Sequence, residues 1–304
     1  MNIHVTVPAT TANLGPGFDA LGLALNLWNE ADFTLRDDGQ IVLTVQGEGE
    51  GKLPLDAKNM VAESALHLFE LVGEPCPGMQ IHCLNRVPLG SGMGSSSAAK
   101  LTGFLGANGL LGSPMTDEQI LKLAIETEGH PDNVAPAMLG GLVASIVHED
   151  RVFSMRLPAR ANHGAIYATI ALPDFEFPTH HARSILPTTV DRQDAIFNIS
   201  RAILVTEALR TGNPELLGIA MKDSLHQPYR LPLIPGAVDA LEAAKLSGAD
   251  AVALSGAGPG MIAFSSRIIP EIGIAMQAAF EAAGLSARIF ELATSYEGAE
   301  VTIV

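Results

Sequence analysis

The run Pro88-Leu89-Gly90-Ser91-Gly92-Met93-Gly94-Ser95-Ser96-Ser97-Ala98 lies between an apolar, strand-like segment and a segment of helix-forming residues. Glycine lets a backbone turn tightly and approach a ligand closely. Successive amides in such a loop can point their N–H groups at an anion, and the helix that follows adds the positive end of its dipole. The run therefore predicts a phosphate-binding loop that leads from a strand into a helix.

Two familiar phosphate-binding motifs do not match this loop. A Walker A motif has lysine directly after its last glycine, whereas here Ser95 follows Gly94. Lys100 lies at least a turn into the helix and is interpreted as solvated. No GxGxxG motif follows the first strand, which argues against a dinucleotide site. The alternative is an ordinary flexible loop, but seven Gly and Ser residues at a helix start favour phosphate binding.

The composition limits the classes of protein to consider. With 304 residues, the chain is expected to form two domains or one large one. Its formal net charge of −15 argues against a nucleic-acid partner, because duplex binding depends on Lys and Arg at the phosphates. Cys76 and Cys83 form neither a CxxC motif nor a disulfide framework, so a cytoplasmic location is expected. We also expect no signal peptide and no membrane span.

The first half of the chain is predicted to contain a mostly antiparallel sheet. Alternating patterns predict strands at 2–8, 20–27, 30–35, 41–46 and 79–84, and a second hairpin from 141–147 and 152–157. The turn Asp37-Asp38-Gly39-Gln40 favours a hairpin between the strands at 30–35 and 41–46.

Three helices are expected in the same half, at 57–72, 95–111 and 116–128. Asp56 can cap the first of them and Gly73 can end it. Thr116 and Gln119 match a capping box at the start of the third, and Gly129 ends it.

The second half has the order β-α-β-β-α-β, which is the split arrangement of ferredoxin-like domains. A long loop rich in Pro and His follows its first strand, and we place the boundary between the domains near residue 158, giving domains 1–158 and 159–304. Strands are predicted at 164–171, 250–255, 261–265, 286–291 and 300–304, and helices at 192–211, 215–222, 235–248 and 270–283.

Three further stretches could carry chemistry, and each has a plain structural alternative. Asn13 and Asp19 lie in a loop between strands, where both residue types also serve as turn formers. Glu126 and Glu128 end a helix, where carboxylates oppose the dipole, so a nearby cation such as Mg²⁺ and a solvated helix end are equally supported. The stretch 255–260 is equally well read as a Gly-rich hairpin turn.

Two arginines stand in loop-like, Pro-flanked contexts. Arg183 and Arg230 lie on no regular polar helix face, and arginine makes planar, bidentate contacts with carboxylates. This favours ligand contact, although surface arginines are common. The histidines nearby show no HExxH or His/Cys spacing, so a metal site built on them is not expected.

Taken in order, these stretches resemble the GHMP kinase family. An Asn/Asp loop, a Pro-x-x-x-Gly-x-Gly-Ser-Ser loop and a late Gly-rich turn follow one another as they do there. The closer match is to members that act on L-homoserine, and four segments spread over the chain carry it: PATTANLGPGFDALGLAL at 8–25, EGHPDNVAPAMLGG at 128–141, THHARSILP at 179–187 and PYRLPLIPG at 228–236. Met93, where the loop often has Leu, is a small departure that leaves the main chain unchanged.

The resemblance implies an α+β, two-domain GHMP kinase fold. Its N-terminal domain would be ribosomal-protein-S5-domain-2-like, its C-terminal domain ferredoxin-like, and the site would lie between them. It also implies transfer of the γ-phosphoryl group of ATP, with Mg²⁺, to the side-chain hydroxyl of L-homoserine. Residues 88–98 would hold the nucleotide phosphates. The implied Mg²⁺ ligands are Ser96, or its neighbour Ser95, and Glu126 in preference to Glu128.

Substrate roles follow from the same resemblance. Arg183 and Arg230, with Thr179 beside them, would bind the carboxylate of L-homoserine. Asp19 would face its ammonium or hydroxyl group. The hydroxyl would be positioned by Asn13, His130 and Asn133.

Asn133 and Asp19 are the expected catalytic residues, and our hypothesis is that they orient the hydroxyl without fully deprotonating it, because the loose transition state of phosphoryl transfer is stabilised mainly by positioning and charge. The family also suggests a homodimer. Two alternatives stay open: a GHMP kinase for mevalonate, shikimate or pantoate, and a non-catalytic ligand sensor on the same fold.

Overall fold

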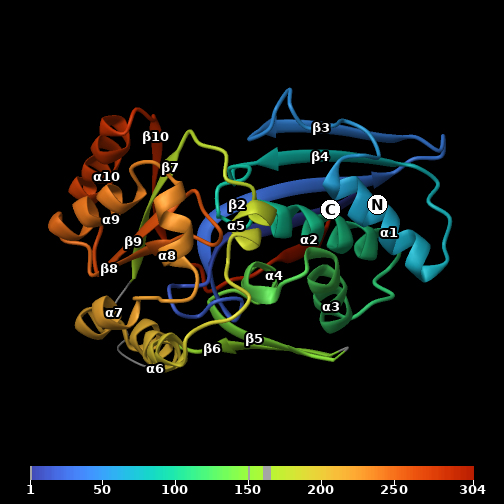
Figure 1. Ribbon diagram of the computed structural model, residues 1–304. Coiled ribbons are helices and arrows are strands. Elements are labelled where there is room, and N and C mark those ends of the chain that lie inside the picture. Colours follow the sequence, from blue (N-terminus) through green and yellow to red (C-terminus); the bar gives the residue numbers. More distant parts are fainter. Residues whose placement is uncertain (1, 150, 160–165) are drawn as a thin grey trace.

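In the computed structural model, which describes residues 2–149, 151–159 and 166–304, the strands form two sheets (Figure 1). The first sheet is 7-stranded and contains the N-terminal strand between β11 and β2. Its main order is β11 (Glu300–Ile303), β1 (Asn2–Ala12), β2 (Leu21–Leu35), β4 (Met79–Asn85) and β3 (Ile41–Gly47), and the hairpin of β5 (Leu142–His148) and β6 (Arg151–Leu157) joins it through β2.

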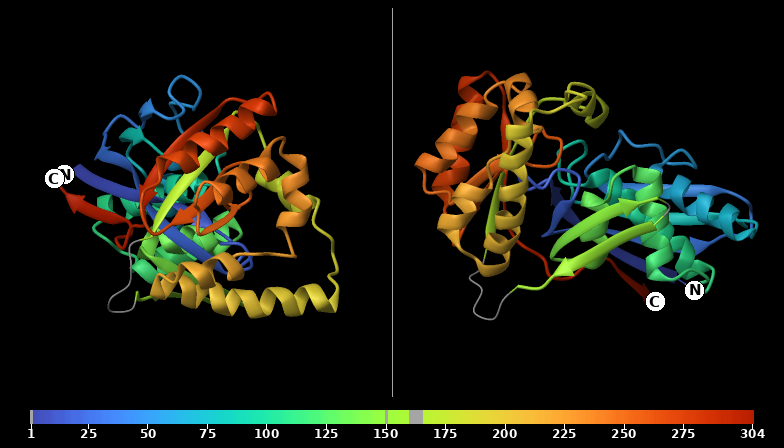
Figure 2. Two further views of the ribbon diagram at one scale, coloured as in Figure 1. Left: turned by 90° about the vertical axis from the view of Figure 1, so that its left-hand side faces the viewer. Right: turned by 60° about the horizontal axis from the view of Figure 1, so that its bottom comes forward.

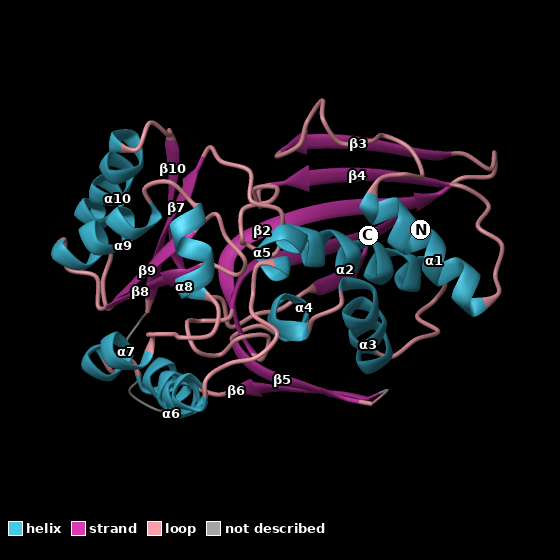
Figure 3. Ribbon diagram, in the orientation of Figure 1, coloured by secondary structure: helices cyan, strands magenta, loops and turns pink. Residues whose placement is uncertain are grey.

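Four helices pack on one face of the first sheet (Figure 3). They are α1 (Met60–Val72), α2 (Ser95–Leu110), α3 (Asp117–Glu128) and α4 (Pro131–Leu139). The reason lies in the alternation of β1, where Ile3, Val5 and Val7 are fully buried against the helices while Thr6 between them lies on the other face. The apolar side of each strand thus determines which face the helices cover.

Most helix predictions for this half are confirmed. Gly73 ends α1 in the left-handed conformation, and the capping box of Thr116 and Gln119 is formed at the start of α3. The prediction that Asp56 caps α1 is wrong. The N-cap is Asn59, three residues later, whose side chain accepts a hydrogen bond from the Val61 amide. Helix α4 was not predicted, although its first residue is a proline, as is common at helix starts.

The prediction of a hairpin between the strands at 30–35 and 41–46 is wrong, because these two strands do not pair. Strand β2 pairs with β4, and β3 lies on the far side of β4, parallel to it. The turn residues bond instead to the segment that enters β4, with the Gly39 amide 2.9 Å from the Pro77 carbonyl oxygen. Because α1 connects β3 to β4, the unit is β-α-β, and such a crossover produces parallel strands. The strands expected at 20–27 and 30–35 also form one continuous β2.

The second sheet has the ferredoxin-like arrangement that the sequence predicts. Its order is β10 (Ala287–Ala293), β7 (Tyr167–Pro173), β9 (Met261–Ser265) and β8 (Ala251–Leu254), and all neighbours are antiparallel. Helices α9 (Ala237–Leu246) and α10 (Pro270–Ala282) pack on one face, and α6 (Arg192–Thr211) and α7 (Pro214–Ala220) contribute to the core on the other. The first two residues of the strand expected at 164–171 lie outside the described residues.

Two short helices in the second half were not predicted. Helix α5 (Thr179–Ser184) lies within the loop rich in Pro and His, and α8 (Gln227–Arg230) is followed by a 3₁₀ turn, η1 (Leu231–Leu233). Both are shorter than the runs over which helical periodicity can be recognised. They matter because each carries one of the two arginines singled out above.

The two sheets share an apolar core. Leu23 and Leu25 of β2 pack in one cluster with Ile170 and Phe264 of the second sheet. The chain also returns to the first sheet, because β11 pairs with β1. The division at residue 158 therefore stays a prediction about the chain rather than a separation of two independent cores. Within the described residues, no helix is long and apolar enough to cross a membrane.

Candidate active site

The Gly/Ser loop adopts the conformation that its glycines allow. Gly90, Gly92 and Gly94 have φ angles of 59°, 76° and 73°, in the left-handed region that other residues avoid. Gly94 directly precedes α2, and no described side chain caps that helix. The first amides of α2 are therefore left to an anion, together with the positive end of the helix dipole.

The loop is held in place by the hairpin turn at 255–260 of the second sheet. Ser255 Oγ donates a hydrogen bond of 2.7 Å to the Gly92 carbonyl oxygen, and the Gly260 amide donates one of 3.2 Å to that of Ser91. A Cβ on Gly92 would lie 2.2 Å from the Ser255 carbonyl oxygen, so a side chain does not fit there. The turn thus supports the loop directly, which the sequence left undecided.

Glu128 faces the loop from the end of α3. Its Oε2 accepts a hydrogen bond of 3.0 Å from Ser96 Oγ, and its Oε1 accepts one of 2.9 Å from Ser97 Oγ. Lys100 Nζ lies 2.5 Å from Oε2, and the Glu128 side chain is only 8% exposed. Burial acts to raise the pKa of Glu128, but the hydrogen bond and charge of Lys100 outweigh it and the pKa is lowered.

This arrangement corrects two expectations. Glu126 was expected to join Ser96 at a metal ion, but its side chain is 54% exposed and pairs with Lys122 on the same helix. Positions two apart lie on different sides of a helix, so only Glu128 faces the loop. Lys100 was interpreted as solvated, yet its side chain is 19% exposed and ion-paired. Ser95, the alternative to Ser96, is the first residue of α2.

Asp19 and Arg183 form an ion pair between distant parts of the chain. The two guanidinium nitrogens of Arg183, on α5, lie 3.0 and 2.7 Å from the two carboxylate oxygens of Asp19. Asp19 has a φ of 55°, and its amide donates to the side chain of Asn13, which fixes the turn. The hydrogen bond and charge of Asp19 raise the pKa of Arg183. The structure therefore brings together two of the predicted substrate residues.

Arg230 is buried near this pair. It is 1% exposed, and its Nε donates a 2.9 Å hydrogen bond to the Ala182 carbonyl oxygen in α5. Burial, reinforced by the charge of Arg183, lowers the pKa of Arg230 to about 10. The guanidinium also lies 5.3 Å from the ring centre of Phe18, and the Phe18 ring stacks on the imidazole of His226. Arg230 thus remains a cation at neutral pH, and burial is the main cause of its lowered pKa.

His130 and Asn133 stand at the start of α4, next to the Gly/Ser loop. His130 Nδ1 is 2.8 Å from Asp132 Oδ1. Burial disfavours the charged imidazole, but the hydrogen bond and charge of Asp132 prevail, and the pKa of His130 is raised. Asn133 Oδ1 accepts a 2.8 Å hydrogen bond from Thr10 Oγ1. A Cβ on Gly94 would lie 3.1 Å from the same Oδ1, so Asn133 borders the loop.

The two remaining predicted residues have different surroundings. Asn13 is buried, and its Nδ2 donates a 2.8 Å hydrogen bond to the Gly256 carbonyl oxygen, so it joins the Asp19 turn to the 255–260 turn. Thr179 is exposed at the start of α5, one helical turn from Arg183. The structure therefore places Asn13 in a supporting position and leaves Thr179 at the surface.

The donor set at Glu128 suits a hard divalent cation. A carboxylate and two serine hydroxyls offer the oxygen ligands that Mg²⁺ prefers, and the amides of α2 would hold the phosphates that complete its shell. Among the described residues, no group of three or more His, Cys, Asp or Glu side chains could hold a metal alone. A metal at Glu128 would therefore be shared with a phosphate ligand, as Mg²⁺ usually is.

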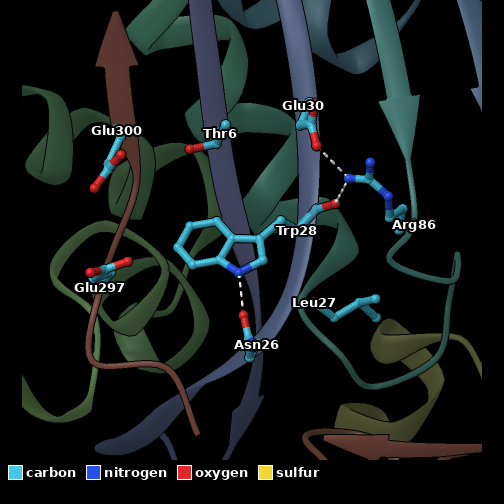
Figure 4. Close-up of a pocket in the computed structure, with 8 residues that line it drawn as sticks. All are labelled: Thr6, Asn26, Leu27, Trp28, Glu30, Arg86, Glu297 and Glu300. Carbon is cyan, nitrogen blue, oxygen red and sulfur yellow. Dashed lines mark hydrogen bonds and ion pairs between the residues drawn. The ribbon is translucent and has the colours of Figure 1, made fainter. Parts of the chain in front are cut away.

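A pocket of about 380 Å³ lies elsewhere, on the face of the first sheet that the helices leave open (Figure 4). Trp28, Glu30 and Arg86 line it, with Arg86 donating to the Glu30 carboxylate and the Trp28 carbonyl oxygen. The predicted site residues do not line this pocket. The functional site is thus defined by the convergence of polar groups around the Gly/Ser loop and not by the size of a cavity.

Comparison with known proteins agrees with this convergence. The model of the GHMP kinases N terminal domain matches residues 59–141, and that of the GHMP kinases C terminal domain matches residues 205–268. A homoserine kinase of Moorella thermoacetica is 45% identical over 98% of this chain and 99% of its own. The chain belongs to the homoserine kinase family of GHMP kinases.

Two further members of this family are similar over the same extent. A homoserine kinase of Synechococcus is 42% identical over 99% of this chain and 98% of its own. The crystal structure of homoserine kinase from Cytophaga hutchinsonii superposes with a TM-score of 0.87 at 35% identity, covering 99% of this chain and 97% of that one. The fold class expected from the sequence is therefore confirmed.

Sequence reasoning missed several residues that build the site of this homoserine kinase family member. Phe18 lies inside the quoted segment 8–25, and no pattern in the sequence places its ring beside two arginines. The side chain of Asp223 is fully buried and accepts from the amides of Leu225, His226 and Gln227, which fixes the segment that carries Arg230. Asp223 lies four residues before α8, whose N-cap position is His226, so the usual N-cap pattern does not reveal its role.

Proposed function

We propose that the chain catalyses the ATP- and Mg²⁺-dependent phosphorylation of the side-chain hydroxyl of L-homoserine, giving O-phospho-L-homoserine. One observation carries the proposal most strongly. Glu128, which faces the Gly/Ser loop, and Arg183, which pairs with Asp19, are both close enough to His130 for their charges to act on its imidazole, so His130 stands between a phosphate site and a charged small-molecule site. The membership of the homoserine kinase family supports the choice of substrate.

The charges of the site complement an amino acid. L-homoserine carries a carboxylate and an ammonium group, and the site offers cationic and anionic groups side by side. We infer that the substrate carboxylate takes the place of Asp19 on Arg183 and adds a negative charge beside the buried Arg230. Asp19, released from Arg183, then binds the ammonium group.

The nucleotide would be held largely by main-chain groups. Residues 88–98 would bind the phosphates through those amides that have no other partner, including the first amides of α2, and Ser96 with Glu128 would hold Mg²⁺. When bound, Mg²⁺ supplies charge neutralisation between the β- and γ-phosphates. Glu128 replaces Glu126 in this proposal.

The hydroxyl would be positioned without a strong base. Thr10 occupies Oδ1 of Asn133, so Nδ2 is the end that would meet the substrate oxygen. Without substrate, the carboxylate of Asp19 accepts hydrogen bonds from the guanidinium of Arg183. We therefore propose that Asn133 and Asp19 orient the hydroxyl and that Thr179 and Asn13 act from the edge of the site.

Two finer points are part of the proposal. We propose a homodimer, as the family suggests, and a cytoplasmic location, as the two cysteines without a disulfide framework suggest. Light scattering on the purified protein measures the first directly, and a mass near twice 31.8 kDa is the expected result.

The deciding experiment is coupled ADP release with ATP and Mg²⁺ on a panel of acceptors. L-homoserine, mevalonate, shikimate, pantoate and galactose are compared, with EDTA as the control. Turnover of L-homoserine alone, abolished by EDTA, is the expected result. Preference for another acceptor would overturn the roles given to Arg183 and Arg230 and retain the phosphate site.

A further inference from the structure

Lys100 makes contacts that the proposed reaction does not use. Its Nζ lies 2.5 Å from Glu128 Oε2 and donates a 2.9 Å hydrogen bond to the carbonyl oxygen of Thr127. Both side chains are largely buried, at 19% and 8% exposed. An ammonium group therefore already sits on the carboxylate that faces the Gly/Ser loop.

The carboxylate has little capacity left for a second cation. Oε2 accepts from Lys100 and Ser96, and Oε1 accepts from Ser97. A magnesium ion bonded to either oxygen lies about 2.0–2.1 Å from it, close enough to repel an ammonium group on the same carboxylate. The two cations compete for one anion.

Lys100 also donates a hydrogen bond to the Thr127 carbonyl oxygen, which can hold the ammonium group when Glu128 binds a metal. The Thr127 carbonyl is in the last turn of α3, where carbonyl groups lack helical partners and lysine interacts favourably with the dipole. Rotation about the end of the side chain keeps the Thr127 hydrogen bond while releasing Glu128. Exchange of cations thus requires no movement of the backbone.

We propose that Lys100 is a resident cation that neutralises Glu128 in the metal-free protein and is displaced from it by Mg²⁺, so that Lys100 weakens metal binding and sets the concentration of Mg²⁺ that the protein requires. This inference rests on the metal site of the proposed function and assigns to Lys100 a positioning role, without contact with the reacting atoms.

The test is metal affinity, measured with Mn²⁺ by electron paramagnetic resonance, with and without a non-hydrolysable ATP analogue. Lys100→Met removes the charge at nearly constant length. Its dissociation constant for Mn²⁺ should fall by roughly tenfold, a typical coupling between two competing ligands. Lys100→Arg keeps a cation and should bind Mn²⁺ as the wild type does. Lys122→Met is the matched control, because Lys122 pairs with the exposed Glu126 on the outer side of α3.

Stability without metal gives an independent readout. Lys100→Met leaves Glu128 buried without a cation, so its melting temperature in EDTA should be lower than that of the wild type, and Mn²⁺ should raise it by more. Lys100→Gln keeps an N–H donor without the charge, folds more readily, and should show the same tighter binding. Unchanged or weaker Mn²⁺ binding by both neutral variants would overturn the proposal.

Glu128→Gln separates this inference from the function on which it rests. If this variant loses Mn²⁺ binding while the neutral Lys100 variants bind as the wild type does, only the role of Lys100 is overturned. If Glu128→Gln binds Mn²⁺ like the wild type, the metal site itself is wrong, and the inference fails with it.

Discussion

At the scale of single residues, the site is decided by which side of a helix a carboxylate occupies. Glu126 and Glu128 are two positions apart, and the helical period puts only Glu128 in line with the buried Leu121 and Ala124. The structure distinguishes the two through partners, since Glu128 is buried against Ser96 and Ser97 while Glu126 is exposed beside Lys122. The same reasoning identifies Lys100 as part of the site.

Replacing each glutamate separately by glutamine compares their contributions to catalysis. Glu128→Gln should lower kcat by roughly 10²-fold or more, because the metal would lose its carboxylate ligand. Glu126→Gln should leave kcat within about twofold, as expected for an exposed surface pair. Initial rates at saturating ATP and varied Mg²⁺ check both, and equal losses in the two variants would refute the assignment of Glu128.

Arg183 should act mainly on substrate affinity. In Arg183→Lys the single ammonium cannot reproduce the bidentate geometry seen with Asp19, so KM for L-homoserine should rise by roughly 10- to 100-fold. KM for ATP should not change, because the arginine lies in the substrate half of the site. Steady-state kinetics with each substrate varied in turn test this, and a rise confined to the KM for ATP would contradict it.

The His130–Asp132 pair predicts a pH-dependent contribution to stability. The pKa of His130 is raised above its ordinary 6.5 in the folded state, so the charged form stabilises the fold. That contribution is fully present below the unfolded pKa and is lost as the pH rises through the folded pKa. The melting temperature of His130→Gln should therefore fall below that of the wild type by more at pH of about 5.5 than at about 9. An equal deficit at both values would show that the charge is not involved.

At the scale of elements, the Gly/Ser loop was predictable because its chemistry is local. Three glycines before a helix allow a left-handed backbone without steric cost, and all three adopt it in the structure. The capping box of α3 was equally predictable, since its two members are three residues apart. The hairpin at 37–40 failed because strand pairing depends on β4, almost forty residues later in the chain.

Two glycines of the loop should respond differently to alanine. A Cβ on Gly92 would lie 2.2 Å from the Ser255 carbonyl oxygen, whereas none of the described atoms comes within 4 Å of a Cβ on Gly90. Gly90→Ala should cost only the strain of its positive φ, about 1 kcal/mol. Gly92→Ala should cost several-fold more because the backbone must move. Urea unfolding of both variants measures the difference, and similar midpoints would disprove the close contact with the turn.

At the scale of the whole molecule, the arginines could be singled out from the sequence but not placed. Arg183 and Asp19 are separated by 164 positions, and only the packing of α5 over the Asp19 turn brings them together. The family resemblance implied that Arg183 and Asp19 both contact the substrate. That the two residues also pair with each other depends on the tertiary fold. The long-range part of the site is thus a property of the tertiary fold.

The shared core predicts that both halves unfold together. Trp28, the one tryptophan of the chain, lies in the first sheet and reports on it by fluorescence. Ile170→Ala, in the second sheet, should destabilise the protein by about 2–4 kcal/mol and shift the Trp28 transition together with that seen by circular dichroism. Ile274→Ala, at a residue 66% exposed on α10, is the control and should shift neither. Two separated transitions would show that the halves unfold independently.

The return of β11 to the first sheet has a consequence for biosynthesis. The amide of Val304 donates a 2.9 Å hydrogen bond to the Asn2 carbonyl oxygen, and the two ends of the chain lie side by side (Figure 2). Because β11 follows the whole second sheet in the chain, the edge beside β1 stays uncovered until the second half has been synthesised. The first sheet, whose strands β1 to β6 are synthesised before the second sheet, therefore reaches its full width only after the second sheet has been synthesised.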